Sequence, residues 1–242
     1  MNIKKTQFIK WFLFLPIASL LACSIGENSF ITPTPIVEPE LSVEEILNHS
    51  HTVMLDTKTV KFQISHSNGF TEIMDGIFLT NAQGEFVNPD AVSIIFDGEM
   101  SNGFYIKSGF KIVQDEVFML NPFRENEWEL LPPNMNPFDE MDPIDSIGQV
   151  IENLQNIRSF NYDPNTQQYN VFGDIKTDFV APIFGLNGLL DQSTNIELKI
   201  DSNHFYINQV RLIGPIGNRD PEDIVRKIIF SNYNEPLLIE VP

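Results

Sequence analysis

Apolar residues recur at helical spacing at the start of the folded part of the chain. Ser42, with Glu45 three residues later, has the pattern of a capping box. We therefore predict a helix that begins after Ser42 and ends near Leu55. The residues expected to share its inner face are Val43, Ile46, Leu47, Ser50 and Met54.

Short segments with a two-residue alternation follow this helix. In the first of them Val60, Phe62 and Ile64 alternate with polar residues, as in a strand with one buried face. Turn residues are closely spaced, and we expect turns at 68–69, 81–84, 88–90 and 97–98. The predicted strands are 60–65, 73–80, 91–96, 104–106, 110–114 and 116–120. Such an order predicts an antiparallel meander and not a βαβ repeat.

The second half of the chain adds one helix and further strands. Prolines interrupt residues 122–143, so we expect a loop there that carries Trp128. A helix is predicted from Asp142 or Pro143 to Leu154, with an acidic first turn that suits the helix dipole. Strands are expected at 159–162, 168–175, 195–201 and 203–213. A short helical turn after Asp220 and an extended segment at 228–230 would close the chain.

The segment from Phe179 to Leu190 is very apolar but is interrupted by Pro182 and two glycines. It is too irregular for a strand and too apolar for an exposed loop. Two compatible interpretations remain open: a short core helix that closes the sheet, or a flexible apolar lining beside a cavity.

The strand period also assigns side chains to faces. Three sets should point to the same, concave side of the sheet, because their alternating neighbours, such as Lys61 and Lys199, can face water. Ile95 breaks the alternation in one of them. The sets are Val60, Phe62 and Ile64; Val92, Ile94 and Phe96; and Ile196, Leu198 and Ile200.

The first residues of the chain have the organisation of a lipoprotein signal. Basic residues precede an apolar run of 12 residues, Trp11 to Ala22, which contains Pro16 and is followed by Cys23. A spanning helix needs roughly 20 apolar residues. We therefore predict cleavage of residues 1–22 and attachment of a diacylglycerol to Cys23, with a free thiol in an ordinary secretory signal as the alternative. The expected location is the outward-facing surface of a bacterial cell membrane.

Cys23 is the one cysteine of the chain, which excludes an intrachain disulfide. Residues 23–41 contain Pro33, Pro35 and Pro39 and are typical of a semi-rigid tether, which could hold a domain roughly 50 Å from the anchor. Residues 42–242 then suffice for a single domain.

Charge and motifs narrow the function. Beyond the signal the chain has 12 basic and 33 acidic residues, a net charge of −21, which disfavours nucleic acid as a partner. No nucleophile with a neighbouring base and no phosphate-binding loop can be named from spacing, so we expect neither an enzyme nor a cofactor. His49 and His51 would face different ways on a helix and are not a metal pair. The acidic cluster at 139–142 lacks the pattern of a calcium loop.

The order of these features resembles the LppX/LprA/LprF/LprG lipoprotein family. The segments that carry the resemblance are the lipobox, the Pro-rich tether, the first helix, the meander with Gly84-Glu85-Phe86-Val87-Asn88-Pro89-Asp90, then Asp115-Glu116-Val117-Phe118-Met119-Leu120-Asn121-Pro122 with Trp128, and the closing Phe230-Ser231-Asn232-Tyr233-Asn234-Glu235-Pro236. This is a likeness of turns and strand ends, with no catalytic motif.

The resemblance implies an α+β fold in which a strongly curved antiparallel sheet, a half-barrel, wraps helices on its concave side. It also implies an apolar cavity between them that holds the acyl chains of a lipid or glycolipid carried across the envelope, with a possible envelope transport partner. The 20 phenylalanines would supply apolar surface for such a cavity or only fill a core. The alternative function is a lipid-anchored interaction module with a filled core. The candidate lining residues are Phe62, Ile64, Val92, Ile94, Phe96, Phe179, Ile183, Phe184, Leu186, Leu189 and Leu198.

Overall fold

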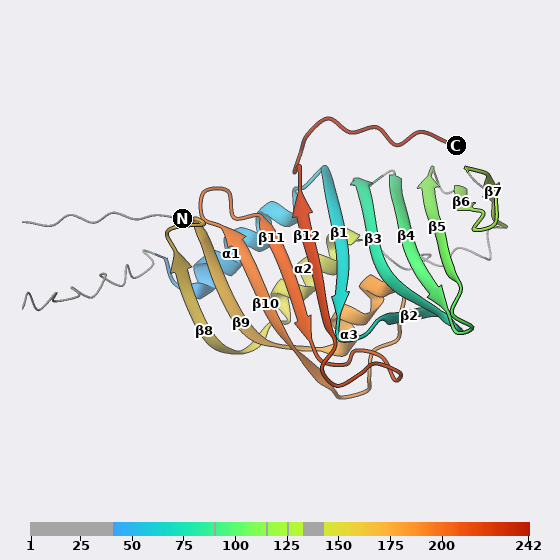
Figure 1. Ribbon diagram of the computed structural model, residues 1–242. Helices are drawn as coiled ribbons and strands as arrows, with labels where there is room; N and C mark the ends of the chain where they lie inside the picture. The colour runs from blue at the N-terminus through green and yellow to red at the C-terminus, as the bar shows by residue number, and fades with distance from the viewer. Residues whose placement is uncertain (1–40, 90, 115, 125, 133–142) are drawn as a thin grey trace, which may run out of the picture. The chain divides into compact units, whose positions relative to one another are not determined.

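The computed structural model describes residues 41–89, 91–114, 116–124, 126–132 and 143–242 (Figure 1). The signal, Cys23, nearly all of the tether and the acidic cluster at 139–142 lie outside these ranges, so the expectations for them stay predictions. In the ranges given, no helix is long and apolar enough to cross a membrane.

One sheet of twelve strands, paired antiparallel throughout, makes up most of the described domain. Its order is β7-β6-β5-β4-β3-β1-β12-β11-β10-β9-β8, and β2 pairs with β3 off this path. The strands are β1 (Thr59–Ser67), β2 (Thr71–Met74), β3 (Ile77–Val87), β4 (Ala91–Met100), β5 (Tyr105–Val113), β6 (Glu116–Leu120), β7 (Trp128–Leu130), β8 (Gln155–Asp163), β9 (Gln168–Lys176), β10 (Ser193–Asp201), β11 (Ile207–Ile213) and β12 (Val225–Ser231).

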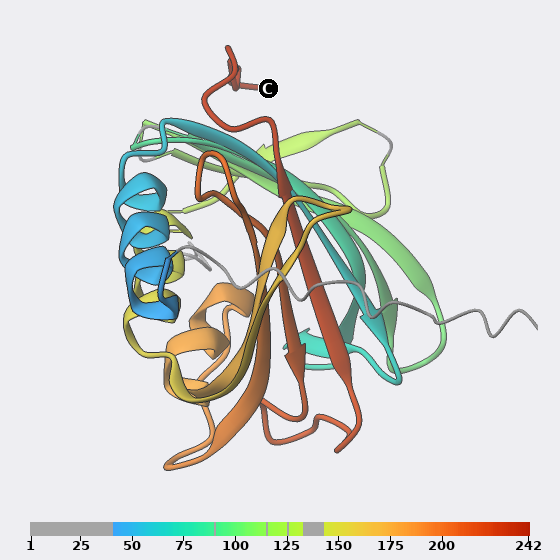
Figure 2. The ribbon, with the colours of Figure 1, turned by 90° about the vertical axis from the view of Figure 1, so that its left-hand side faces the viewer.

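The helices lie together on one side of this sheet, which curves around them (Figure 2). They are α1 (Val43–Leu55), α2 (Pro143–Glu152), α3 (Thr177–Val180) and the 3-10 helix η2 (Ala181–Phe184). The expectation of an antiparallel α+β fold is confirmed.

The capping box predicts the start of α1 correctly. The Ser42 hydroxyl accepts a hydrogen bond from the Glu45 amide, and the Glu45 carboxylate accepts one from the Ser42 amide at 2.8 Å. The helix ends at Leu55, as predicted, and buries Ile46 and Met54 in the core.

Residue pairing shows which side chains share a face. Leu198 lies opposite Val210, Val210 opposite Ile228, and Ile228 opposite Ile64. Ile64 in turn lies opposite Ala82, and Ala82 opposite Phe96. Directly opposed residues of antiparallel strands point to the same face. The three sets predicted from the alternation therefore do share one face, and their buried members belong to the same core cluster as Ile46 and Met54 of α1.

The predicted turn at 81–84 is wrong, because β3 runs through these residues. A register shift between Leu79 and Asn81 marks a bulge, which adds one residue to the strand. The buried residues of β3 are Leu79 before the bulge and Ala82, Gly84 and Phe86 after it, so the two-residue alternation is interrupted between them. The predicted strand 73–80 is in fact two strands, β2 and β3.

Other boundaries also differ from the predictions. Strand β4 continues past the expected turn at 97–98, and residues 104–106 and 110–114 belong largely to one strand, β5. Trp128 begins the short strand β7 and does not lie in a loop. The closing segment is β12, which pairs with both β1 and β11 near the middle of the sheet, and a turn precedes it where a helical turn was expected.

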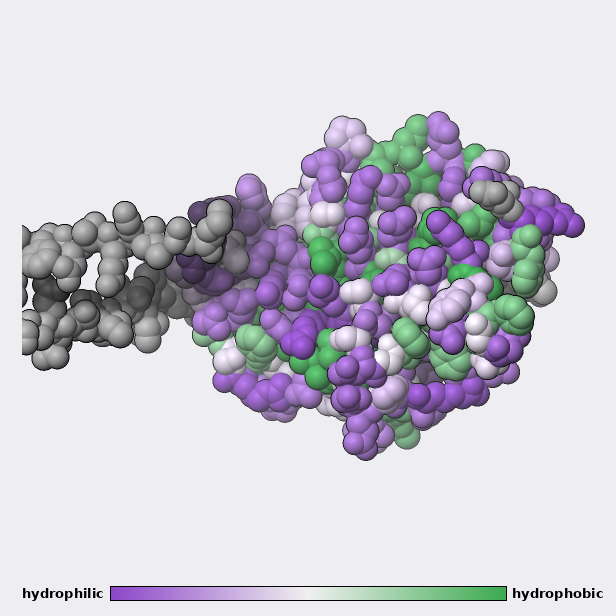
Figure 3. Space-filling model, in the orientation of Figure 1, coloured by the Kyte–Doolittle hydropathy of each residue, from purple (hydrophilic) through white to green (hydrophobic). Residues whose placement is uncertain are grey.

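The opposite face of the sheet is mainly hydrophilic (Figure 3). Residues such as Lys61, Glu85 and Gln63 alternate with the core residues of the same strands. One apolar interior therefore lies between the sheet and the helices.

Candidate functional site

An apolar cavity lies on the helix side of the sheet. Its walls come from β1 to β5 and from the end of η2. None of the side chains that line it is titratable or nucleophilic. The lining residues are Ile64, Ile73, Met74, Leu79, Ala82, Ile94, Phe96, Phe110, Ile183, Phe184 and Gly185.

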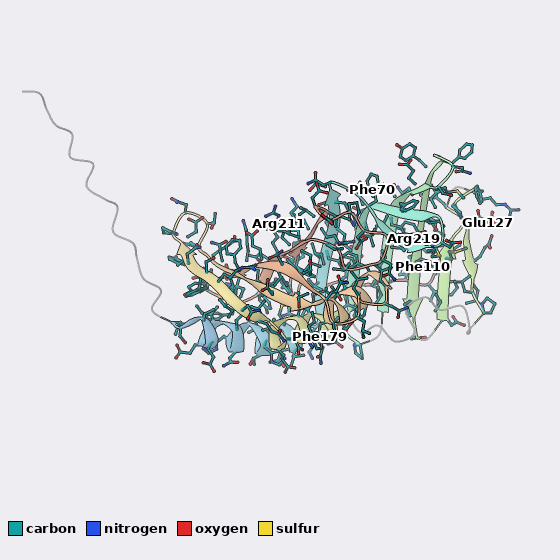
Figure 4. All side chains as sticks on the ribbon, turned by 90° about the horizontal axis from the view of Figure 1, so that it is seen from below. Phe70, Phe110, Glu127, Phe179, Arg211 and Arg219 are labelled. Atoms are coloured by element: carbon teal, nitrogen blue, oxygen red, sulfur yellow. The ribbon has the colours of Figure 1, made fainter. Side chains whose placement is uncertain are left out.

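Small residues on β3 leave room for this cavity. Ala82 lies between Ile64 and Phe96 in the row of paired residues, and its short side chain leaves space above the sheet. Beyond it the ring of Phe62 lies against Gly84, where an added Cβ would come within 2.3 Å of the Phe62 Cζ atom. Phe96 and Phe110 stack with ring centroids 6.1 Å apart and line the cavity on the side of β5. Figure 4 labels Phe110.

The segment after α3 forms the opposite wall. Gly185 ends η2 in the left-handed conformation, with φ of 67°. Glycine adopts this conformation without steric strain because it has no Cβ. Met74 and Gly185 are the exposed members of the lining, so the cavity meets solvent beside them. The cavity has a volume of about 90 Å³. Pockets that enclose drug-sized ligands usually measure roughly 300–1,000 Å³.

Five of the predicted lining residues border this cavity: Ile64, Ile94, Phe96, Ile183 and Phe184. Leu198 is fully buried in the core under β10, and Leu189 is also buried. Phe62, Val92 and Phe179 are partly buried against the core. Leu186 also packs against the core and lines a separate polar depression with Arg219 and Asp220. Which of these contact a ligand stays a prediction.

Sequence reasoning missed the lining residues Ile73, Met74, Leu79, Ala82 and Phe110. Phe110 lies directly opposite Ile94, so its place follows once β4 and β5 are paired in the right register. Ala82 could not be found from the alternation, because the bulge before it shifts the buried positions.

A buried ion pair lies behind the cavity wall. The fully buried Arg226 of β12 reaches the Asp220 carboxylate at 2.5 Å and donates to the Gly214 carbonyl at 3.3 Å. Asp220 also accepts from the amides of Ile216 and Gly217. Burial lowers the pKa of Arg226, and the neighbouring Asp220 opposes that shift.

His66 joins this cluster through Thr71. The Arg226 Nε–H donates to the Thr71 hydroxyl at 2.7 Å, and that oxygen lies 2.8 Å from Nε2 of His66. Nδ1 of His66 lies 3.0 Å from the Thr80 carbonyl, which can only accept. Nδ1 therefore carries the proton, and Nε2 accepts from Thr71 in the neutral ring. Burial lowers the pKa of His66.

The other polar contacts of the described residues are spread over the fold. Over the described ranges, no three His, Cys, Asp or Glu side chains come together to hold a metal ion. His51 on α1 lies 3.2 Å from Glu152 on α2, and Tyr233 donates its hydroxyl to the Ile207 carbonyl at 2.5 Å. Burial raises the pKa of Tyr233 well above its usual value. These contacts connect elements of the fold.

Comparison with solved structures places the fold among known ones. The structure is similar to the crystal structure of LprF from Mycobacterium bovis, with a TM-score of 0.60 and 16% sequence identity, over 85% of this chain and 99% of that one. No protein-family model and no curated protein matches the sequence. At this identity the similarity shows a shared fold, and the fold is the one that the sequence resemblance implied.

Proposed function

We propose that this protein is a distant member of the LppX/LprF-type lipoproteins that binds the acyl chains of a lipid or glycolipid and carries it across the envelope. In this proposal Cys23 bears the lipid anchor, and the half-barrel sheet and the helices enclose the ligand. The observation that carries it is the cavity between β1 to β5 and residues 183–185, whose lining is apolar throughout. The LprF-like fold supports it.

The chemistry of the lining suits a hydrocarbon ligand. Acyl chains offer no hydrogen-bonding groups, and their transfer from water to an apolar wall gains roughly 0.8 kcal/mol per methylene. A polar ligand buried here would lose its hydrogen bonds to water without replacement. Ile64, Ile94, Phe96, Ile183 and Phe184 are the proposed contacts.

The cavity must widen to accept an acyl chain. At about 90 Å³ it holds only a few methylene groups. Two of its borders can move at low cost: β2, which pairs with β3 alone among the described strands, and Gly185, which has open space around it. We therefore propose that the ligand enters between Met74 and Gly185.

The small volume favours the alternative of a filled core. On that interpretation the protein is an anchored interaction module that docks an envelope protein through its acidic surface, and the cavity is a packing defect. The two functions differ in what the purified protein contains.

The test is lipid extraction from the chain of residues 23–242 with Cys23→Ser, which carries no covalent lipid. The protein is purified from a bacterial host, washed in mild detergent and extracted with organic solvent for mass spectrometry. The proposal predicts acyl lipid in a defined molar ratio to protein. A lipid-free protein that also fails to take up a fluorescent fatty acid would contradict it.

A further inference from the structure

Two large apolar side chains project from the turn between β4 and β5. Phe104 is 67% exposed and Tyr105 is 79% exposed. Single exposed apolar residues are ordinary on a protein surface, but neighbouring ones often mark an interaction site.

A second turn lies directly against this one and brings a third apolar side chain. Met100 lies opposite Ile77, and the Ser101 amide donates to the Gly76 carbonyl at 2.9 Å. Met74, at the end of β2, is 40% exposed and also lines the cavity. We call Met74, Phe104 and Tyr105 the tip surface, which takes in both faces of the sheet at this end: Met74 lies on the cavity face, and Tyr105, opposite Glu99, lies on the outer face. Figure 4 views the domain from this end and shows Phe70 and Arg219 beside β2, which leads to the tip.

We propose that the tip surface inserts into the head-group layer of a lipid bilayer and so places the mouth of the cavity at the membrane. This inference rests on the proposed lipid-binding function and names where the lipid is exchanged. Phe and Tyr rings favour the boundary between head groups and acyl chains. Met74 belongs both to the tip surface and to the cavity, so a lipid could pass from one to the other.

Backbone groups of the β4–β5 turn form hydrogen bonds within the turn, which lowers the cost of removing them from water. The Met100 amide donates to the Phe104 carbonyl at 2.8 Å, and the Gly103 amide to the Met100 carbonyl at 2.8 Å. The Phe104 amide donates to the Asn102 side chain at 3.2 Å. Because these groups are satisfied within the turn, their burial among head groups costs little.

The charges around the tip surface indicate which bilayer it suits. Asp75 follows Met74 directly, Glu99 lies opposite Tyr105, and Lys107 is two residues further along β5. These three side chains sum to −1, and the whole chain is acidic. Attraction to anionic lipids therefore contributes nothing, and the contact should form on zwitterionic lipid and persist at high salt. The lipid anchor on Cys23 would keep the domain close to the membrane, so a weak contact suffices.

The test is flotation of the residue 23–242 chain carrying Cys23→Ser with vesicles of phosphatidylcholine alone, at low and at 0.5 M salt. We expect a bound fraction that salt does not reduce. The double variant Phe104→Ser/Tyr105→Ser should lower the partition coefficient roughly tenfold or more. Phe123→Ser is the matched control, because Phe123 is 82% exposed on the separate β6–β7 turn. It should bind as the unsubstituted chain does.

Failure of this inference can be told from failure of the proposed function. No flotation, or equal flotation of the tip variant, would overturn the inference, whatever lipid the protein contains. Flotation that depends on Phe104 and Tyr105 in a chain that yields no extractable lipid would support the membrane contact and contradict the lipid-binding function.

Discussion

The guanidinium carbon of Arg226 lies 5.5 Å from the centre of the Phe184 ring. Phe184 also lines the apolar cavity, and Arg226 is paired with the buried Asp220 carboxylate. Phe184 therefore adjoins both the proposed ligand space and a buried ion pair. The attraction between a cation and an aromatic ring helps to hold η2 in this position.

Loss of one partner of this pair should destabilise the domain strongly. Arg226→Met leaves the Asp220 carboxylate buried without its cation, at a cost of about 3–5 kcal/mol in the free energy of unfolding. The double variant Arg226→Met/Asp220→Leu should recover part of that loss, because no charge then remains buried. Urea unfolding of Arg226→Met, Asp220→Leu and the double variant measures the coupling. Simple additivity of the two substitutions would show that the pair does not act as a unit.

The free energy of unfolding should also decrease as the pH is lowered, because of His66. Burial lowers the pKa of His66 in the folded state, so the unfolded chain binds more protons near its ordinary value of 6.5. The stability that the neutral ring contributes is present above pH 6.5 and is lost as pH falls through the lowered pKa. A protonated ring would face the Arg226 cation through Thr71, and the Asp220 carboxylate would oppose that repulsion. His66→Gln should flatten the dependence of the unfolding midpoint between pH 7.5 and 5.5. An unchanged slope in this variant would assign the effect to other groups.

The contact between Phe62 and Gly84 should not tolerate a methyl group. In Gly84→Ala the new Cβ would lie 2.7 Å from the Ser93 carbonyl oxygen and closer still to the Phe62 ring. We expect a loss of about 1–3 kcal/mol. Gly98→Ala is the matched control, because its nearest neighbour would lie at 3.2 Å. Thermal unfolding of both variants, and of Gly84→Ala with Phe62→Leu, tests this. Equal losses for Gly84→Ala and Gly98→Ala would argue against a specific clash.

Removal of the proposed lipid anchor at Cys23 should change where the protein is found in the cell. The variant Phe104→Ser/Tyr105→Ser keeps Cys23 and should stay with membranes after a high-salt wash. Adding Cys23→Ser to it should give a folded protein that the wash releases, because both the anchor and the tip surface are then lost. Deletion of residues 32–40 should leave the unfolding temperature unchanged, because this Pro-rich segment is predicted to be a tether outside the domain. Fractionation and thermal unfolding measure the two effects. A triple variant that still sediments with washed membranes would contradict the anchor.

The alternation of apolar residues predicted which strand faces meet, as the row through Ile64 and Leu198 confirms. The alternation predicted β3 wrongly, because a β-bulge interrupts the two-residue pattern in that strand. Residues 81–84 have the composition of a turn, but in the structure they follow a bulge within β3. The small residues Ala82 and Gly84 make room for the cavity and the Phe62 ring.

The long-range arrangement could not be derived from local pattern. Strand β12 pairs Ile228 with both Ile64 and Val210, and Ile64 is distant in sequence. Likewise, Met74 reaches the cavity only because β2 folds back on β3. Such contacts depend on pairing between distant segments, which periodicity within one segment does not encode.

The most direct test of the lipid cavity is to fill it and to count the bound lipid. Ala82→Phe places a ring in the cavity, whereas Gln83→Phe places the same ring on the opposite, outer face of the same strand. Both variants are first shown to be folded by circular dichroism, and acyl lipid per protein is then measured by mass spectrometry. The account predicts that Ala82→Phe loses most of its lipid while Gln83→Phe retains the amount of the unsubstituted chain. Equal lipid in two folded variants would contradict a ligand site between β1 to β5 and residues 183–185.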